Sequence, residues 1–174
     1  MSEIHFWTQT VTIGGSDYDI TMATTSQGLC WLSLGCAYEE ETALKAWAKR
    51  WFPNLELIRQ RQVNTMLIEE IEEYLAGKRQ EFTVPLHQMG TPFQIRVWQE
   101  LCRIPYGETN SYADIAERVG CPKGPRAIGL ANNKNPISLV VPCHRVIGIN
   151  GSLTGYGGGL DLKHKLLKLE GAKT

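Results

Sequence analysis

Residues 139–146 read Leu-Val-Val-Pro-Cys-His-Arg-Val, so an apolar run typical of a strand ends at a proline and is followed at once by a thiol, an imidazole and a guanidinium. Cysteine reacts as its thiolate, and a nearby cation or imidazole lowers the thiol pKa from its usual value of about 8.5. His144 and Arg145 supply both groups beside Cys143. The pattern predicts a nucleophilic cysteine after a strand over residues 137–141. The alternative is a structural cysteine, because free cysteine is often buried.

The 174-residue chain is 43% hydrophobic, which is enough for one large domain or two small ones. The N-terminus lacks a basic and apolar leader, and no stretch approaches the roughly 18 apolar residues of a membrane span. We therefore expect no membrane partner and a cytoplasmic location, nucleoid-associated if the protein is bacterial and nuclear if it is eukaryotic.

The five cysteines form an odd set without CxxC pairs, which argues against a disulfide framework and a common zinc finger. We expect all five to be reduced thiols. His5, Cys30 and His87 are scattered and do not form a recognisable set of zinc ligands, so no metal is expected.

The net charge of zero hides an asymmetry between the two halves of the chain. Residues 1–88 carry 7 Lys/Arg and 12 Asp/Glu, a net charge of −5, whereas residues 89–174 carry 11 and 6, a net charge of +5. A basic half suggests a polyanionic partner such as DNA, because neutralised phosphates supply most non-specific DNA affinity. Solvated surfaces also carry such imbalances, so the charge alone decides little.

The first half has the pattern of a small α/β domain. Alternating residues predict an antiparallel meander, and apolar residues at helical spacing predict two helices that cover it. The expected strands span residues 8–13, 18–23 and 29–34, and the expected helices span residues 39–52 and 64–76. A connector over residues 82–91 begins with a strand-like segment at 82–84.

The second half is mainly helical by the same criteria. Thr91 is a candidate N-cap and Pro92 a candidate first residue for a helix over residues 93–102. Helices over residues 111–119 and 126–132, joined by a Gly/Pro turn, have the form of a helix-turn-helix. The strand at 137–141, a glycine-rich stretch and a closing helix over residues 160–169 follow.

Residues 91–171 resemble the C-terminal domain of the O6-alkylguanine-DNA alkyltransferases, the methylated-DNA-protein-cysteine methyltransferases. The first half matches only in length and general pattern. The matching segments keep their order along the chain: Pro92-Phe93-Gln94, Val97-Trp98, Ile104-Pro105-Tyr106-Gly107, Ser111-Tyr112, Arg126-Ala127-Ile128-Gly129, Asn135-Pro136, Pro142-Cys143-His144-Arg145-Val146-Ile147-Gly148, Gly155-Tyr156, Gly158-Gly159, Leu166-Leu167 and Glu170-Gly171.

The resemblance implies a fold of two domains. Residues 1–88 form an α/β support domain, a small ribonuclease-H-like sheet with helices. Residues 89–174 form a mainly α domain for DNA binding and alkyl transfer, with a winged-helix-like helix-turn-helix.

The resemblance also implies a reaction, in which Cys143 takes an alkyl group from O6 of guanine in DNA and keeps it as S-alkylcysteine. His144 is the expected base, acting through a bound water, and Glu170 orients it in a Cys-His-carboxylate relay. Asn135 supports the active-site turn, and Arg145 serves as scaffold through ion pairing or carbonyl contacts. Read singly, Glu170 is a solvated helix-end charge and Asn135 a loop residue.

Further roles implied by the resemblance concern DNA, because the target atom lies inside the duplex and the nucleotide must be extruded. Arg126 fills the vacated space from a helix in the minor groove, where small Ala127 allows close approach. Tyr112 pushes on the phosphate of the extruded nucleotide. Read alone, Arg126 is a surface arginine and Tyr112 a core tyrosine.

The pocket for the extruded base is implied in the same way. Tyr156 forms part of its wall, and main-chain groups of Cys143 and Val146, with Ser111 nearby, meet the guanine edges. Some relatives carry a hydroxyl where this chain has Gly157, so that side-chain hydrogen bond to O6 is unavailable here.

The expected function is stoichiometric DNA repair by a monomer without a cofactor, acting on double-stranded DNA through the minor groove. O4-alkylthymine is a further candidate substrate. Two other readings stay open: a non-catalytic sensor of alkylated bases, against which Cys143 argues, and a Cys-His-Glu hydrolase, against which the helix-turn-helix and Arg126 argue.

Overall fold

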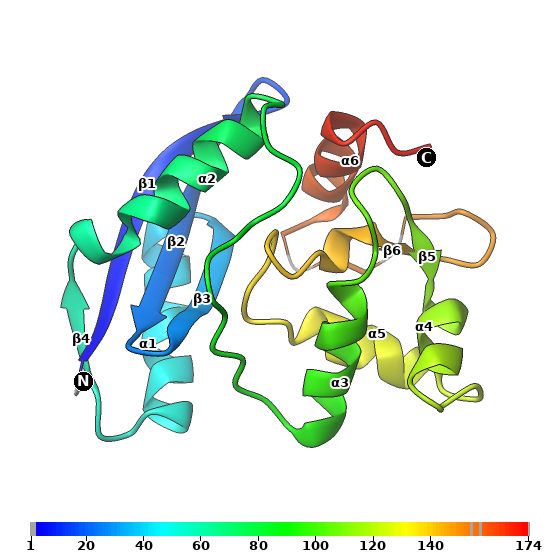
Figure 1. Ribbon diagram of the computed structural model, residues 1–174, viewed down its shortest axis with the longest axis horizontal. Coiled ribbons are helices and arrows are strands. Elements are labelled where there is room, and N and C mark those ends of the chain that lie inside the picture. The colour runs from blue at the N-terminus through cyan, green and yellow to red at the C-terminus, as the bar shows by residue number, and fades with distance from the viewer. Residues whose placement is uncertain (1–2, 154, 157, 174) are drawn as a thin grey trace. The chain divides into compact units, whose positions relative to one another are not determined.

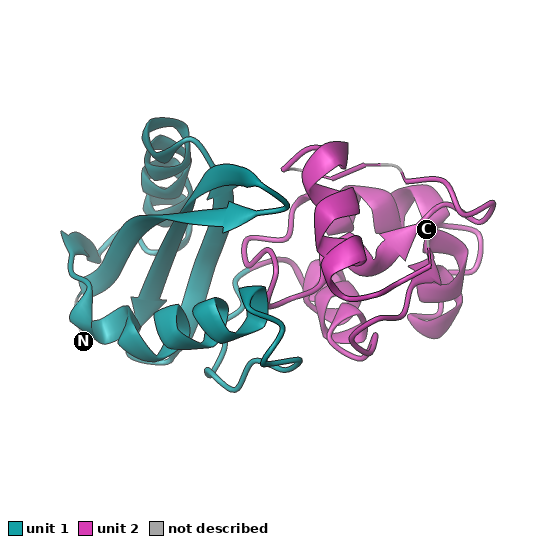
Figure 2. Cartoon of the chain, turned by 90° about the horizontal axis from the view of Figure 1, so that it is seen from above, with its two compact units in different colours: residues 1–89 teal, residues 90–174 magenta. Residues whose placement is uncertain are grey.

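The computed structural model describes residues 3–153, 155–156 and 158–173. It divides into two compact units, Met1–Met89 and Gly90–Thr174 (Figure 2).

The first unit is built on a four-stranded sheet with the order β3-β2-β1-β4. The first three strands form the expected antiparallel meander, and β4 runs parallel to β1. Gly14 and Gly15 join β1 to β2, and both have a positive φ, as a two-residue hairpin loop requires. The strands are β1 (Glu3–Ile13), β2 (Ser16–Thr25), β3 (Gly28–Gly35) and β4 (Glu56–Arg59).

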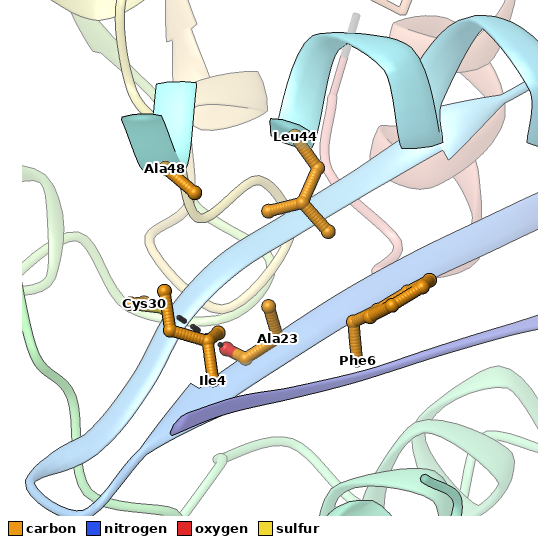
Figure 3. Packing of buried hydrophobic residues seen from close by; sticks show 6 residues of the cluster. All are labelled: Ile4, Phe6, Ala23, Cys30, Leu44 and Ala48. Atoms are coloured by element: carbon orange, nitrogen blue, oxygen red, sulfur yellow. Dashed lines mark hydrogen bonds between the residues drawn. The ribbon is translucent and has the colours of Figure 1, made fainter. Parts of the chain in front are cut away.

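Two helices, α1 (Ala37–Trp51) and α2 (Thr65–Leu75), cover opposite faces of this sheet (Figures 1 and 2), and a short 3-10 turn, η1 (Gln62–Asn64), precedes α2. The core under α1 is apolar throughout and consists of Ile4, Phe6, Ala23, Cys30, Leu44 and Ala48 (Figure 3). The Cys30 thiol donates to Ala23 O at 3.3 Å, and burial raises its pKa to about 12. Cys30 is therefore an unreactive core thiol.

The connector differs from its prediction, because residues 82–84 are not a strand. The Glu70 carboxylate, itself buried, accepts hydrogen bonds from Thr83 N at 2.8 Å and from the Thr83 hydroxyl. These side-chain bonds satisfy the segment without a strand partner. The connector meets the sheet further on, where Leu86 forms an isolated bridge with Leu29 of β3.

The second unit contains four helices among its described residues. They are α3 (Pro92–Leu101), α4 (Tyr112–Arg118), α5 (Pro125–Asn133) and α6 (Leu160–Leu169). Thr91 and Gln94 form a capping box at the start of α3, with Pro92 in the first turn, which confirms the predicted helix start. A two-stranded parallel pair of β5 (Asn110–Ser111) and β6 (Val146–Ile147) was not expected.

The predicted strand at residues 137–141 is wrong. Ile137 forms only a single β-bridge, and residues 138–140 form a turn in which Val140 N donates to Ser138 O at 2.8 Å and Leu139 adopts a φ of 72°. Leu139 and Val141 are still buried. A short apolar run reports burial rather than extension, so its pattern did not distinguish a strand from a buried turn.

No helix of the described residues is long and apolar enough to cross a membrane. Within the same residues, no three His, Cys, Asp or Glu side chains gather as a set that could hold a metal ion.

Candidate active site around Cys143

Cys143 begins a 3-10 turn, η2 (Cys143–Arg145), that directly precedes β6. Its backbone N donates to Val141 O at 2.7 Å, and the residue is only 4% exposed. The extended backbone assumed from the sequence is therefore replaced by a tight turn. This turn delivers Cys143, His144 and Arg145 together into the interior, where all three are buried.

His144 and Glu170 form the predicted pair. His144 Nε2 lies 2.9 Å from Glu170 Oε2, and neither side chain is exposed. An ionised carboxylate only accepts hydrogen bonds, so Nε2 carries the proton and donates it. Burial lowers the pKa of His144 despite the opposing effect of Glu170, which leaves the imidazole neutral near pH 7. Its lone pair is then on Nδ1, the atom that can accept a proton.

Arg145 holds the same carboxylate from the other side. Its Nε donates to Glu170 Oε1 and its Nη2 to Glu170 Oε2, both at 2.8 Å, while its Nη1 donates to Ile104 O at 2.7 Å. Burial alone raises the pKa of Glu170, but the hydrogen bonds and charges of His144 and Arg145 outweigh it and lower that pKa to about 2. Arg145 thus has both scaffold contacts that were expected of it, and Glu170 is ionised.

The Cys143 thiol is protonated near pH 7. Burial raises the pKa of Cys143, and hydrogen bonding from Asn135 and the charge of Lys163 oppose that rise without cancelling it. A proton acceptor is therefore needed before the sulfur can attack, since the thiolate is the nucleophile.

Asn135 fixes the turn that leads to Cys143. Its Nδ2 donates to Val141 O at 2.9 Å and to Ile137 O at 3.3 Å, and its Oδ1 accepts from Ile137 N at 3.0 Å. One side chain thus satisfies three backbone groups of the segment where the strand had been predicted.

Lys163 is a buried cation beside the end of η2. It is 0% exposed, its Nζ donates to Val146 O, and Nζ lies 5.9 Å from the centre of the Tyr112 ring. Burial lowers the pKa of Lys163 to about 8, with the charge of Cys143 opposing the shift. The ammonium therefore persists at pH 7 and favours a thiolate at Cys143.

Three buried polar atoms of this unit have no hydrogen-bond partner among the described residues: Asn132 Oδ1, His144 Nδ1 and Tyr156 Oη. All three belong to the surroundings of Cys143. Asn132 Nδ2 donates to Cys143 O at 3.3 Å, and the pKa of Tyr156 is raised first by burial and then by the charge of Cys143. Buried polar groups are nearly always paired, so each of these three atoms has hydrogen-bonding capacity that the described protein groups do not use.

Tyr112 and Ser111 lie where β5 passes into α4. The Tyr112 hydroxyl donates to Gly155 O at 3.5 Å. The Ser111 hydroxyl oxygen accepts from Asp114 N at 3.0 Å as the N-cap of α4, and Ser111 pairs with Ile147 of β6. Ser111 is thus near Val146 along the strand pair, with its oxygen engaged in capping.

The remaining predicted residues stand apart from the thiol or outside the described chain. Arg126 is exposed in the first turn of α5, and Ala127 beside it is half-buried. Among the described residues, neither Arg126 nor Ala127 is in contact with Cys143. Gly157 lies outside the described residues.

Sequence reasoning missed Asn132 and Lys163. Each stands on the buried face of its helix, Asn132 with Ile128 and Ala131, and Lys163 with Leu162, Leu166 and Leu167. A polar residue at an apolar position of a helical pattern was the available signal, because such residues are buried only when they are paired.

Known proteins similar to this chain are methyltransferases that act on methylated DNA. Residues 92–172 match the family described as 6-O-methylguanine DNA methyltransferase, DNA binding domain. The chain is 46% identical over 154 residues to the inducible methylated-DNA–protein-cysteine methyltransferase of Bacillus subtilis, a match that covers 88% of this chain and 85% of that protein. The corresponding enzyme of Methanosarcina acetivorans is 52% identical over 122 residues, covering 70% and 74%.

Solved structures show the same similarity over both units. The crystal structure of Mycobacterium tuberculosis OGT in complex with DNA is 39% identical, has a TM-score of 0.78, and covers 96% of this chain and 92% of its own. The M. tuberculosis O6-methylguanine methyltransferase is 38% identical with a TM-score of 0.76, covering 97% and 93%. The chain therefore belongs to the methylated-DNA–protein-cysteine methyltransferase family.

Proposed function

We propose that this protein repairs DNA by moving an alkyl group from O6 of guanine to the sulfur of Cys143. The observation that carries the proposal is the buried thiol beside a neutral imidazole whose tautomer is set by an ionised carboxylate. Membership of the family and the DNA complex of the similar M. tuberculosis protein support DNA as the partner.

The chemistry follows from the protonation states. The Cys143 proton passes to His144 Nδ1, which has no direct hydrogen bond to the sulfur or to any other described group, so a bound water is the bridge. The thiolate attacks the sp3 carbon of the alkyl group, the S–C bond forms as the C–O6 bond breaks, and guanine leaves with a proton from the imidazolium. A thioether is a poor leaving group, so each molecule acts once.

The target base must leave the duplex to reach a buried thiol. We assign Arg126 on α5 to the space that the base vacates, with Ala127 permitting close approach in the minor groove, and Tyr112 to the phosphate of the extruded nucleotide. Tyr156, Ser111 and main-chain groups of Val146 and Cys143 then surround the base.

The finer architecture belongs to the same proposal. The first unit is a ribonuclease-H-like support domain, the α4–α5 pair is a winged-helix-like helix-turn-helix, and the protein acts as a monomer without a cofactor.

Peptide mass spectrometry after incubation with a duplex containing O6-methylguanine tests the proposal. A gain of about 14 Da, one methyl in place of one hydrogen, is expected on the peptide that contains Cys143. Cys143→Ala should bind DNA and transfer nothing. Methyl on another cysteine would show that Cys143 is not the nucleophile. Release of methanol without modification of the protein would favour a hydrolase.

A further inference from the structure

Asn132 places an unused acceptor next to the reactive residue. It is 2% exposed on the inner face of α5, and its Nδ2 donates to Cys143 O at 3.3 Å. Oδ1 and Nδ2 share one carbon, so Oδ1 also lies close to the Cys143 main chain. If Oδ1 and Nδ2 were exchanged, Oδ1 would face Cys143 O, and two acceptors cannot form a hydrogen bond. The contact with Cys143 O therefore fixes the orientation of the amide.

Oδ1 has no hydrogen-bond partner among the described residues. Leaving a buried acceptor unpaired costs about 1–3 kcal/mol. An arrangement of this kind is explained when a bound molecule supplies the donor. Oδ1 only accepts, so the molecule must present an N–H or O–H group there.

The substrate proposed above carries one such group. Alkylation at O6 removes the proton that guanine has at N1, so the exocyclic 2-amino group is the base's remaining N–H donor. We propose that Asn132 is a specificity-determining residue whose Oδ1 accepts a hydrogen bond from the 2-amino group of the extruded O6-alkylguanine. The inference rests on the proposed function and adds the group that the pocket reads.

The assignment also bears on other damaged bases. O6-methylhypoxanthine differs from O6-methylguanine only by lacking the 2-amino group, and O4-methylthymine has no exocyclic amine. Either base would leave Oδ1 unpaired in the complex, and a site built for a hydrogen bond discriminates against a ligand that cannot make it. Both bases should therefore be repaired more slowly.

Single-turnover transfer rates on two duplexes, one with O6-methylguanine and one with O6-methylhypoxanthine, test the inference. The parent protein should favour O6-methylguanine by about tenfold, the value of one hydrogen bond. Asn132→Leu, similar in size and without an acceptor, should bring the ratio close to one, because the O6-methylguanine reaction loses the contact to Oδ1 while the lost Nδ2 bond to Cys143 O affects both reactions alike. Asn133→Ala, the exposed neighbour on α5, is the matched control and should keep the parent ratio.

Equal slowing of both reactions in Asn132→Leu would show that Asn132 only supports the fold, and the inference would be overturned. If that variant does not fold, Asn132→Ala takes its place, and the parent gives an independent check, because equal parent rates on the two duplexes also overturn the inference. A parent that removes methyl from neither duplex would overturn the proposed function itself.

Discussion

Glu170 fixes the tautomer of His144 and compensates the charge of Arg145. Its carboxylate accepts from His144 and from two nitrogens of Arg145, so it stays ionised, holds the imidazole proton on Nε2 and compensates a buried guanidinium. The same residue therefore has a chemical role through His144 and a structural role through Arg145. Its substitution must be analysed for both.

Glu170→Gln should lower the free energy of unfolding by about 3–5 kcal/mol at pH 7, because it leaves Arg145 buried without a counter-charge. The Glu170 pKa is about 2 in the folded protein against an ordinary 4.5, so its contribution is complete above about pH 4.5 and is lost as the pH falls towards 2. Urea unfolding at pH 7 and pH 3 should show a smaller difference between parent and variant at pH 3. Equal differences at both values would contradict the ion pair.

Lys163→Gln should raise the pKa of the Cys143 thiol, because it removes the buried positive charge that favours the thiolate. Transfer at pH 7 should slow by about tenfold for each unit of that rise. The gap should close near pH 10, where Lys163, with a pKa of about 8, is neutral in the parent as well. The pH dependence of the transfer rate checks this.

Lys168→Gln makes the same charge change at an exposed position of α6 and serves as the control. A Lys163→Gln defect of constant size across the pH range would mean that Lys163 merely supports the fold.

At the scale of elements, the sequence predicted helix starts and turns correctly where residues close in the chain satisfy the backbone hydrogen bonds. The Thr91 cap and Pro92 placed the start of α3, and the turn at Gly14 and Gly15 placed the first hairpin. The turn at residues 137–141 was missed because the Asn135 side chain satisfies backbone groups two and six residues further along the chain, which the apolar pattern does not report. The strand β4 was missed because its four residues gain stability from pairing with β1, which the local pattern does not encode.

In the candidate site too, some residues could be predicted from the sequence and others could not. Cys143, His144 and Glu170 were identified from a specific motif, and the structure joins His144 to Glu170 as expected. Asn132 and Lys163 contact the main chain of Cys143 and Val146, and such contacts exist only after folding.

Helix α5 carries the test of base extrusion. Extruding a base costs a few kcal/mol, part of which an inserted guanidinium recovers by stacking. Arg126→Ala should therefore slow repair of duplex DNA by about 100-fold, equivalent to about 2.7 kcal/mol. Free O6-benzylguanine needs no extrusion and should react at close to the parent rate. Arg126→Lys should rescue only partly, because an ammonium keeps the charge but does not stack as a plane.

Equal impairment of Arg126→Ala on the free base would show that Arg126 supports the fold or the pocket instead. Stopped-flow or quenched-flow measurement of both reactions on the same preparation separates the two results.

For the whole molecule, the opposite charges of the two halves predict how DNA is held. Residues 89–174 carry a net charge of +5, and residues 1–88 carry −5. Affinity for an undamaged duplex should fall steeply between about 50 and 200 mM salt, since binding releases counterions from the phosphates. Fluorescence anisotropy titrations measure this dependence. An affinity that does not change with salt would contradict an electrostatic DNA surface.

The central claim is that Cys143 is consumed by the reaction it performs. The direct measurement is the number of methyl groups removed per protein molecule when a duplex containing O6-methylguanine is in large excess. One methyl group per molecule is expected, followed by no further repair, because a thioether is a poor leaving group. Continued removal beyond one equivalent would contradict it.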